Sequence, residues 1–181
     1  EVVHANIYNN GFISSFTGPD GLELFSTAHV LLGGGTTKNE LTTAADLSVT
    51  TLQQALIDYR DVPDERGLKR RRRPGLLMVP FELSFKAEEL LGSEKSPEDA
   101  NNAVNTLSRQ GLSWRAWEYL TDADAWFLLP KNKEEMQVRS YWWQHPVTRH
   151  DVDFKASAAM TKIRSRFIPG WSDWRGPFGS P

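Results

Sequence analysis

Five cations follow one another without interruption and form the strongest local concentration of charge in the sequence. They are Lys69, Arg70, Arg71, Arg72 and Arg73. Such a run can bind phosphate groups, because each contact releases counterions, and binding of this kind weakens as salt rises. A solvated turn and a contact with an acidic neighbour on another subunit are simpler interpretations, because no stacking aromatic residue accompanies the run. The run is therefore a candidate contact surface whose partner the sequence leaves open.

Residues that could perform catalysis or bind a metal are present but scattered. The four histidines show no HExxH spacing, and no G-x-S-x-G motif marks a nucleophilic serine. The absence of cysteine excludes thiol catalysis, disulfides and cysteine-bound zinc. A carboxylate-based hydrolase would rest only on acidic pairs that fit turns or diverging helix positions. These pairs are Glu88–Glu89, Asp122/Asp124 and Asp151/Asp153. The sequence therefore gives no positive support for an enzyme, a cofactor or a metal.

The composition predicts a soluble, folded chain with one substantial domain. The 181 residues are 39% hydrophobic and 24% charged, with a net charge of −2, so a nucleic-acid contact would have to be local. No apolar run approaches the roughly 20 residues needed to cross a bilayer, and no signal peptide opens the chain. The chain begins with Glu1 rather than Met, which suggests a processed, truncated or partial polypeptide.

The clearest secondary structure lies in residues 48–92. Apolar residues at spacings of three and four predict a helix over 48–60, with Asp46 or Ser48 as its N-cap. A short apolar run at 76–79 predicts a buried strand, and Pro80 suits the first position of a second helix that ends at Gly92. This segment therefore has the order helix, strand, helix.

Strands dominate the predicted structure after that segment. A third helix is expected from Asp99 to Gly111, and the chain opens with the tail of a helix. Residues 17–46 and the tail from Pro169 are expected to be irregular. The predicted strands lie at 114–119, 125–129, 137–143 and 163–167, the last with one exposed face. These elements give an α+β fold.

Tryptophans concentrate toward the end of the chain, at Trp142, Trp143, Trp171 and Trp174. They could stack on bases or sugars. Filling a sheet core or a contact between subunits is the simpler interpretation, because tryptophan dominates packed interfaces.

Short motifs along nearly the whole chain, taken in order, resemble the major capsid proteins of tailed bacteriophages, in particular a Mu-like prophage subgroup. Each motif is unspecific alone, and their order and spacing carry the resemblance. The segments are 24–29, 32–35, 45–48, 52–58, 64–68, 77–80, 87–91, 101–102, 119–127, 170–173 and 175–181. The basic run departs from the family pattern, in which this segment is more mixed and partly apolar.

The resemblance implies the Hong Kong phage-type capsid fold, with axial and peripheral subdomains. It implies that this chain lacks the N-terminal arm, the extended loop and most of the spine helix. The implied division has three parts. They are 1–44, the end of the spine helix and a peripheral connecting loop; 45–135, the axial domain; and 136–181, return strands of the peripheral domain with a C-terminal loop.

The function implied by the resemblance is that of a major head subunit. Copies would form hexamers and pentamers of an icosahedral virion shell around double-stranded DNA, assembled in the bacterial cytoplasm. Scaffolding, portal or decoration proteins are further implied partners, and no cofactor or membrane is expected. Without the arm and loop, the chain alone is expected to be a weakly associating monomer, which complete shells in light scattering would contradict. The alternative function is a nucleic-acid-binding module acting through residues 69–73.

Overall fold

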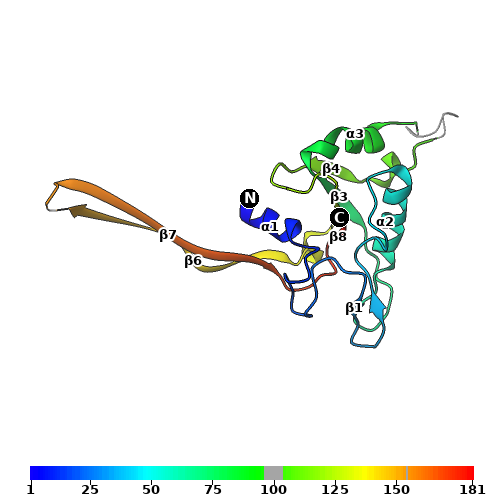
Figure 1. The fold of residues 1–181 in the computed structure, drawn as a ribbon, viewed down its shortest axis with the longest axis horizontal. Helices are drawn as coiled ribbons and strands as arrows, with labels where there is room; N and C mark the ends of the chain where they lie inside the picture. The colour runs from blue at the N-terminus through cyan, green and yellow to red at the C-terminus, as the bar shows by residue number, and fades with distance from the viewer. Residues whose placement is uncertain (96–103, 154) are drawn as a thin grey trace.

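The computed structural model describes residues 1–95, 104–153 and 155–181, and it shows a body of helices and strands from which one long hairpin projects (Figure 1). The helical elements are α1 (Val2–Asn9), α2 (Val49–Asp61), η1 (Phe81–Leu83), α3 (Ser84–Gly92), η2 (Ser108–Gln110) and η3 (Lys133–Glu135). The strands are β1 (His29–Val30), β2 (Thr36–Thr37), β3 (Pro74–Val79), β4 (Ser113–Ala116), β5 (Trp126–Pro130), β6 (Val138–Asp153), β7 (Ala158–Trp171) and β8 (Phe178–Ser180). This mixture agrees with the predicted α+β class.

A four-stranded sheet in the order β4-β3-β5-β8 forms the centre of the body. Strand β3 pairs in parallel with β4 and antiparallel with β5, which in turn pairs antiparallel with β8. The last strand of the chain therefore returns to the main sheet, so residues 178–180 are not the loop that the sequence predicted. Pairing with β5 satisfies their backbone groups.

Both faces of this sheet are buried. Successive side chains along each strand point to opposite faces, so neighbouring residues pack against different layers of the body. Leu77 of β3 and Leu128 of β5 pack with α2 and α3 in one apolar cluster. Their neighbours Met78 and Phe127 point to the other face and pack with α1 and the loops that follow it. Figure 1 shows α1 and α2 on opposite sides of the sheet.

The predicted helix–strand–helix segment is confirmed by α2, β3 and α3. Ser48, rather than Asp46, caps α2: its Oγ accepts the Thr51 N–H at 3.2 Å, and Thr51 Oγ1 accepts the Ser48 N–H at 2.9 Å. This reciprocal pair satisfies amides that have no partner inside the helix. No helix in the described ranges is long and apolar enough to cross a membrane.

Residues 17–46 are mostly irregular, as predicted, and the buried side chain of Asn39 holds them in place. Asn39 Nδ2 donates to the carbonyl oxygens of Leu24 at 2.7 Å and Trp174 at 3.1 Å. Its Oδ1 accepts the Ser26 N–H at 2.9 Å. The long loop is therefore held by its own chain.

The predicted third helix is not continuous in the described residues. Residues 96–103 lie outside the described ranges, and Val104 forms an isolated bridge with Lys95 instead of a helical turn. Only the short η2 follows, and Gly111 ends it with φ +69°, a conformation that favours glycine.

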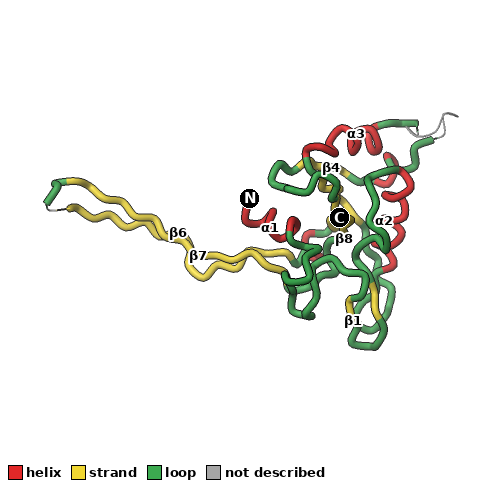
Figure 2. Tube along the Cα trace, in the orientation of Figure 1, coloured by secondary structure: helices red, strands yellow, loops and turns green. Residues whose placement is uncertain are grey.

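The hairpin formed by β6 and β7 is a separate two-stranded sheet, which Figure 2 shows projecting far from the body. Strand β6 has 16 residues, which corresponds to about 50 Å at about 3.3 Å per residue. The sequence predicted shorter strands, and the resemblance implied that strands from 136 onward return to a peripheral sheet. Instead β6 and β7 pair with each other, and the chain carries a long extended element of its own.

Candidate inter-subunit and anion-contact surfaces

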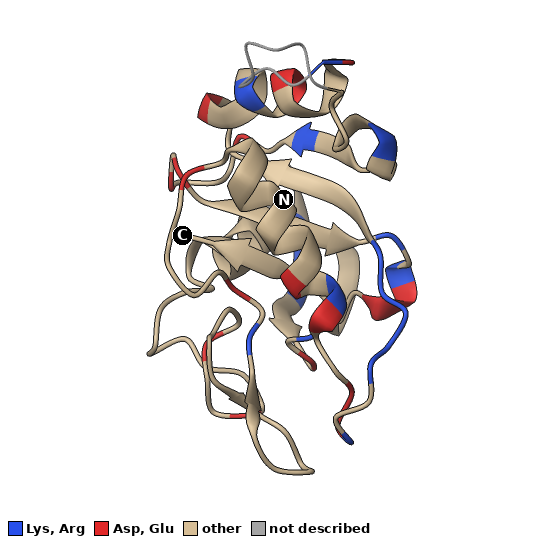
Figure 3. Ribbon diagram, turned by 90° about the vertical axis from the view of Figure 1, so that its right-hand side faces the viewer, with Lys and Arg blue, Asp and Glu red and all other residues tan. Residues whose placement is uncertain are grey.

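The basic run 69–73 connects the end of α2 to the start of β3, and a tight turn fixes where it begins. Asp64 Oδ1 accepts the N–H groups of Arg66 at 2.9 Å and Leu68 at 2.8 Å. The Leu68 N–H is the main reason why the pKa of Asp64 is lowered. Gly67 completes the turn with φ +77°. After this turn the run lies along one edge of the body, where Figure 3 shows it as a stretch of blue coil.

The structure divides the five predicted contact residues into two groups. Arg72 is buried, with 5% of its surface exposed. It donates from Nη2 to the Gly176 carbonyl at 3.2 Å, and its guanidinium carbon lies 4.8 Å from the centre of the Tyr59 ring. Its Nε lies 3.8 Å from Glu135 Oε2. Arg72 therefore stabilises the fold and does not face an external partner.

The other four cations of the run are exposed. Lys69 forms an ion pair with Asp61 at 2.6 Å. Within the described ranges, Arg70, Arg71 and Arg73 form no ion pair within 4.0 Å. The contact surface offered by the run is thus these three arginines.

A second exposed surface is the hairpin, which carries large apolar side chains along its length. They include Trp143 at 87% exposure and Ile163 at 69%. The others are Tyr141, Trp142, Val147, Val152, Met160, Phe167 and Ile168. The sequence predicted one exposed face for residues 163–167, but both faces are exposed because β6–β7 packs on no other sheet. We call residues 138–171 the projecting hairpin.

Cations share one face of the projecting hairpin. Arg149 lies directly opposite Lys162, and Val147 lies opposite Arg164. These residues and Gln144 surround a hollow of about 250 Å³. Like charges directly opposite each other destabilise an isolated strand pair, so this face favours an acidic or solvated environment.

The base of the hairpin is fixed to the body through its first and last residues. His4 of α1 hydrogen-bonds Ser140, and the ring of Phe16 meets that of Trp171 edge-on, with centroids 5.1 Å apart. Trp171 and Trp174 are buried, whereas Trp142 and Trp143 are exposed. Trp171 and Trp174 thus fill the core, as the simpler interpretation predicted, and Trp142 and Trp143 remain candidates for a subunit contact or for stacking on bases or sugars.

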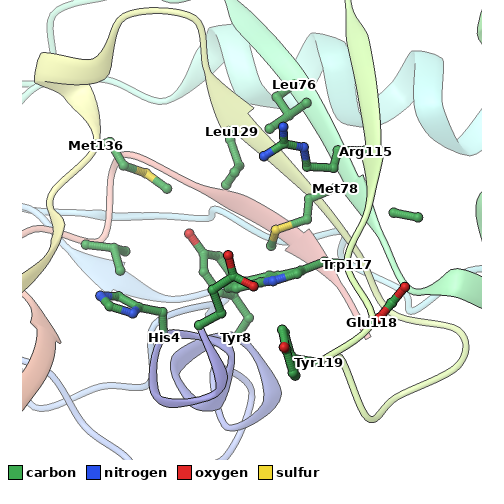
Figure 4. A pocket seen from close by; sticks show the side chains of 13 residues that line it. His4, Tyr8, Leu76, Met78, Arg115, Trp117, Glu118, Tyr119, Leu129 and Met136 are labelled. Carbon is green, nitrogen blue, oxygen red and sulfur yellow. The ribbon is translucent and has the colours of Figure 1, made fainter.

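A hollow of about 570 Å³ lies between α1 and strands β3 to β5. Figure 4 shows His4 and Tyr8 from α1 on one side and Met78, Trp117 and Tyr119 across from them. Most of the lining is apolar or aromatic. This mainly apolar lining suits packing contacts.

The scattered histidines and acidic pairs do not form a site in the described residues. No three His, Asp or Glu side chains within 1–95, 104–153 and 155–181 come together to hold a metal ion. His29 is buried, contacts Asp20 at 2.7 Å, and stacks on Trp174 with ring centroids 4.0 Å apart. Asp122 accepts the Asp124 N–H at 3.1 Å, as expected for a turn.

The sequence did not identify the cations that join the run in space. Arg60, Arg109 and Lys131 lie outside the run in three other segments of the chain, yet they line a hollow with Arg73. No periodicity could have shown this, because the grouping depends on how α2, β5 and the turn after η2 meet.

Comparison with known proteins identifies the family. No curated protein and no solved structure matches the chain. A family model described as "Phage capsid protein" matches residues 3–176, which is nearly the whole sequence. The match begins within α1, includes strands β3, β4 and β5, the basic run and the projecting hairpin, and ends before β8. The chain therefore belongs to the phage capsid protein family.

Proposed function

We propose that this protein is a structural major head subunit that assembles with copies of itself into an icosahedral shell around phage double-stranded DNA. Family membership supports a structural role in a virion capsid, and capsid families are typically non-enzymatic. Assembly in the host bacterial cytoplasm, hexamers and pentamers, and scaffolding, portal or decoration partners belong to the same proposal.

One observation carries the proposal beyond the family: the projecting hairpin leaves large apolar side chains exposed on a ribbon that contacts the body only near its base. An isolated two-stranded hairpin is at best marginally stable in water. Exposed apolar surface on this scale marks an interaction site. Covering the ribbon with a neighbouring copy would bury that surface, and a permanent contact of this kind covers about 1,000 Å² or more.

We extend the proposal to the Hong Kong phage-type fold. A mixed helix-and-sheet body with a long extended hairpin is compatible with it, and the hairpin would then act as the extended loop, which the sequence resemblance implied to be missing from this chain. The division into 1–44, 45–135 and 136–181 is part of this proposal, with two refinements of the third part. Strands β6 and β7 form a two-stranded sheet of their own. Strand β8 at the end of the third part pairs with β5 in the central sheet.

Electron microscopy of particles formed by the chain tests the proposal. Class averages are expected to show rings with five- or six-fold symmetry at high protein concentration. Single unassociated bodies at every concentration, together with turnover of a small molecule, would contradict it.

The nucleic-acid-binding function is the second candidate, because Arg70, Arg71 and Arg73 are exposed without ion pairs in the described residues. Changing these three arginines to alanine should abolish a DNA affinity that falls steeply with salt. Arg72 must be kept, since it stabilises the fold. Equal weak binding before and after the change would dismiss this function.

A further inference from the structure

A polar hollow of about 340 Å³ lies at one side of the body, and four cations surround it. They are Arg60, Arg73, Arg109 and Lys131. The remaining lining residues are Leu56, Pro74, Gln110, Gly111 and Leu112. No carboxylate is among the described residues that line this hollow.

The backbone fixes two of these cations side by side. Pro74 at the start of β3 pairs with Pro130 at the end of β5. The Lys131 N–H donates to the Arg73 carbonyl at 3.0 Å. A Cβ added at Gly75 would lie 2.6 Å from the Lys131 Cα, so only glycine permits this close approach. Arg73 and Lys131 are therefore held together by the sheet.

The other two cations are positioned by elements that pack into the core. Arg60 lies in the last turn of α2 and donates from Nη2 to Gln110 Oε1 at 3.1 Å. Arg109 belongs to η2, which is held between the buried residues Leu107 and Leu112. The four side chains thus come from four separate segments and converge without forming ion pairs among the described residues.

Acidic groups of the neighbouring segments pair with cations that do not line this hollow. Asp58 pairs with Lys38 at 2.7 Å, and Asp61 pairs with Lys69 at 2.6 Å. Glu135 lines the adjoining hollow and lies beside Arg72. Four like charges around one hollow repel one another, and a multivalent anion that enters it relieves the repulsion and releases counterions.

We propose that this hollow is a binding site for closely spaced phosphate groups. Arginine forms paired hydrogen bonds with phosphate, and lysine contributes a point charge. The hollow is several times larger than a water molecule, whose share of the liquid is about 30 Å³, and it has room for a short chain of linked phosphates. The phosphates come either from free polyphosphate or from the backbone of a nucleic acid. Three of the four cations lie outside the basic run.

Isothermal titration of the full chain with tripolyphosphate, and separately with a short DNA duplex, tests this site. Saturable binding near one equivalent is expected, and Arg109→Gln and Lys131→Gln should each weaken it about tenfold. Arg115→Gln, which removes an exposed arginine of β4, is the matched control and should leave affinity unchanged. Both test side chains are exposed, and thermal unfolding checks that each variant folds.

The outcomes separate the sources of phosphate. Tripolyphosphate binding that is lost in both variants assigns the site to free polyphosphate. Duplex binding alone, lost in the same variants, assigns it to nucleic acid. No binding of either probe, or equal loss in the control, overturns the proposal. Self-association lost in Lys131→Gln, without phosphate binding, would identify an acidic group of a second copy as the occupant and also overturn it.

Discussion

The guanidinium of Arg72 lies over the ring of Tyr59, with 4.8 Å between its carbon and the ring centre, and both side chains donate to the carbonyl oxygen of Gly176. This arrangement connects the basic run, α2 and the C-terminal segment. A cation over an aromatic ring is stabilising, more so when it is desolvated. One arginine of an apparently uniform basic run is thus part of the core.

Replacing Arg72 with alanine should lower the free energy of unfolding by about 3 kcal/mol. The change removes a buried hydrogen bond and leaves the buried Glu135 Oε2 without its cation. Arg71→Ala, at an exposed neighbour, should cost about 0.5 kcal/mol or less. Urea denaturation of both variants measures the difference, and equal losses would show that Arg72 is not buried as described.

Stability should fall at high pH because of Tyr59. Burial raises the pKa of Tyr59 to about 12, although Arg72 beside it lowers it. A phenol whose pKa is raised in the folded state stabilises the fold below the unfolded pKa of about 10, and that contribution disappears as pH rises toward about 12.

Tyr59→Phe should therefore be less stable than the wild type at pH 7, by about 1 kcal/mol for the lost hydrogen bond. The difference in the free energy of unfolding between the two proteins should decrease as pH rises above about 10. Denaturation across this pH range measures it, with Tyr119→Phe at an exposed ring as the control. A difference in stability that stays constant with pH would contradict a raised pKa of Tyr59 in the folded protein.

Asn39→Asp should destabilise the protein strongly at neutral pH. The amide nitrogen that donates to the Leu24 and Trp174 carbonyls becomes an oxygen, which cannot donate when ionised. We expect a loss of about 3 kcal/mol. The loss should shrink toward pH 4, where the new carboxyl group binds a proton and donates again.

Asn132→Asp provides the control for that change. The Asn132 side chain accepts the Glu134 N–H at 3.2 Å, and a carboxylate accepts it equally well. Thermal unfolding at both pH values compares the two variants. An Asn39→Asp protein as stable as the Asn132→Asp protein would show that the loop 17–46 does not depend on this side chain.

Amide hydrogens in the outer half of the projecting hairpin should exchange much faster than those of β5 when the chain is dilute. The outer strands have only each other as hydrogen-bond partners, whereas β5 lies between β3 and β8. Hydrogen-exchange mass spectrometry compares the two segments directly. Equal protection in dilute solution would mean that something already covers the hairpin.

The sequence predicts best where local signals agree with burial. The N-cap residue Ser48 and apolar residues spaced three and four apart predict α2. The apolar residues 76–79, which lie between two turns, predict β3. The length of the hairpin was underestimated because the alternation of apolar and polar residues that marks a half-buried strand covers only short parts of β6 and β7, both of whose faces are exposed.

The candidate site was predictable only in part. The run identifies Arg70, Arg71 and Arg73 correctly as exposed cations, but Arg72 turns inward because side chains alternate in extended backbone that leads into β3. The cations of the proposed phosphate site come from separate segments. Their grouping with Arg73 follows from tertiary packing, for which one sequence carries no local signal.

Sedimentation velocity over a series of concentrations tests most directly whether the projecting hairpin is covered by another copy of the chain. The wild type should form larger species as concentration rises, and a Trp143→Ser/Ile163→Ser variant should remain a monomer with unchanged unfolding. Leu68→Ser, which changes an exposed apolar residue of the body, should associate like the wild type. A wild-type chain that stays monomeric throughout, or a hairpin variant that associates equally, would contradict the account.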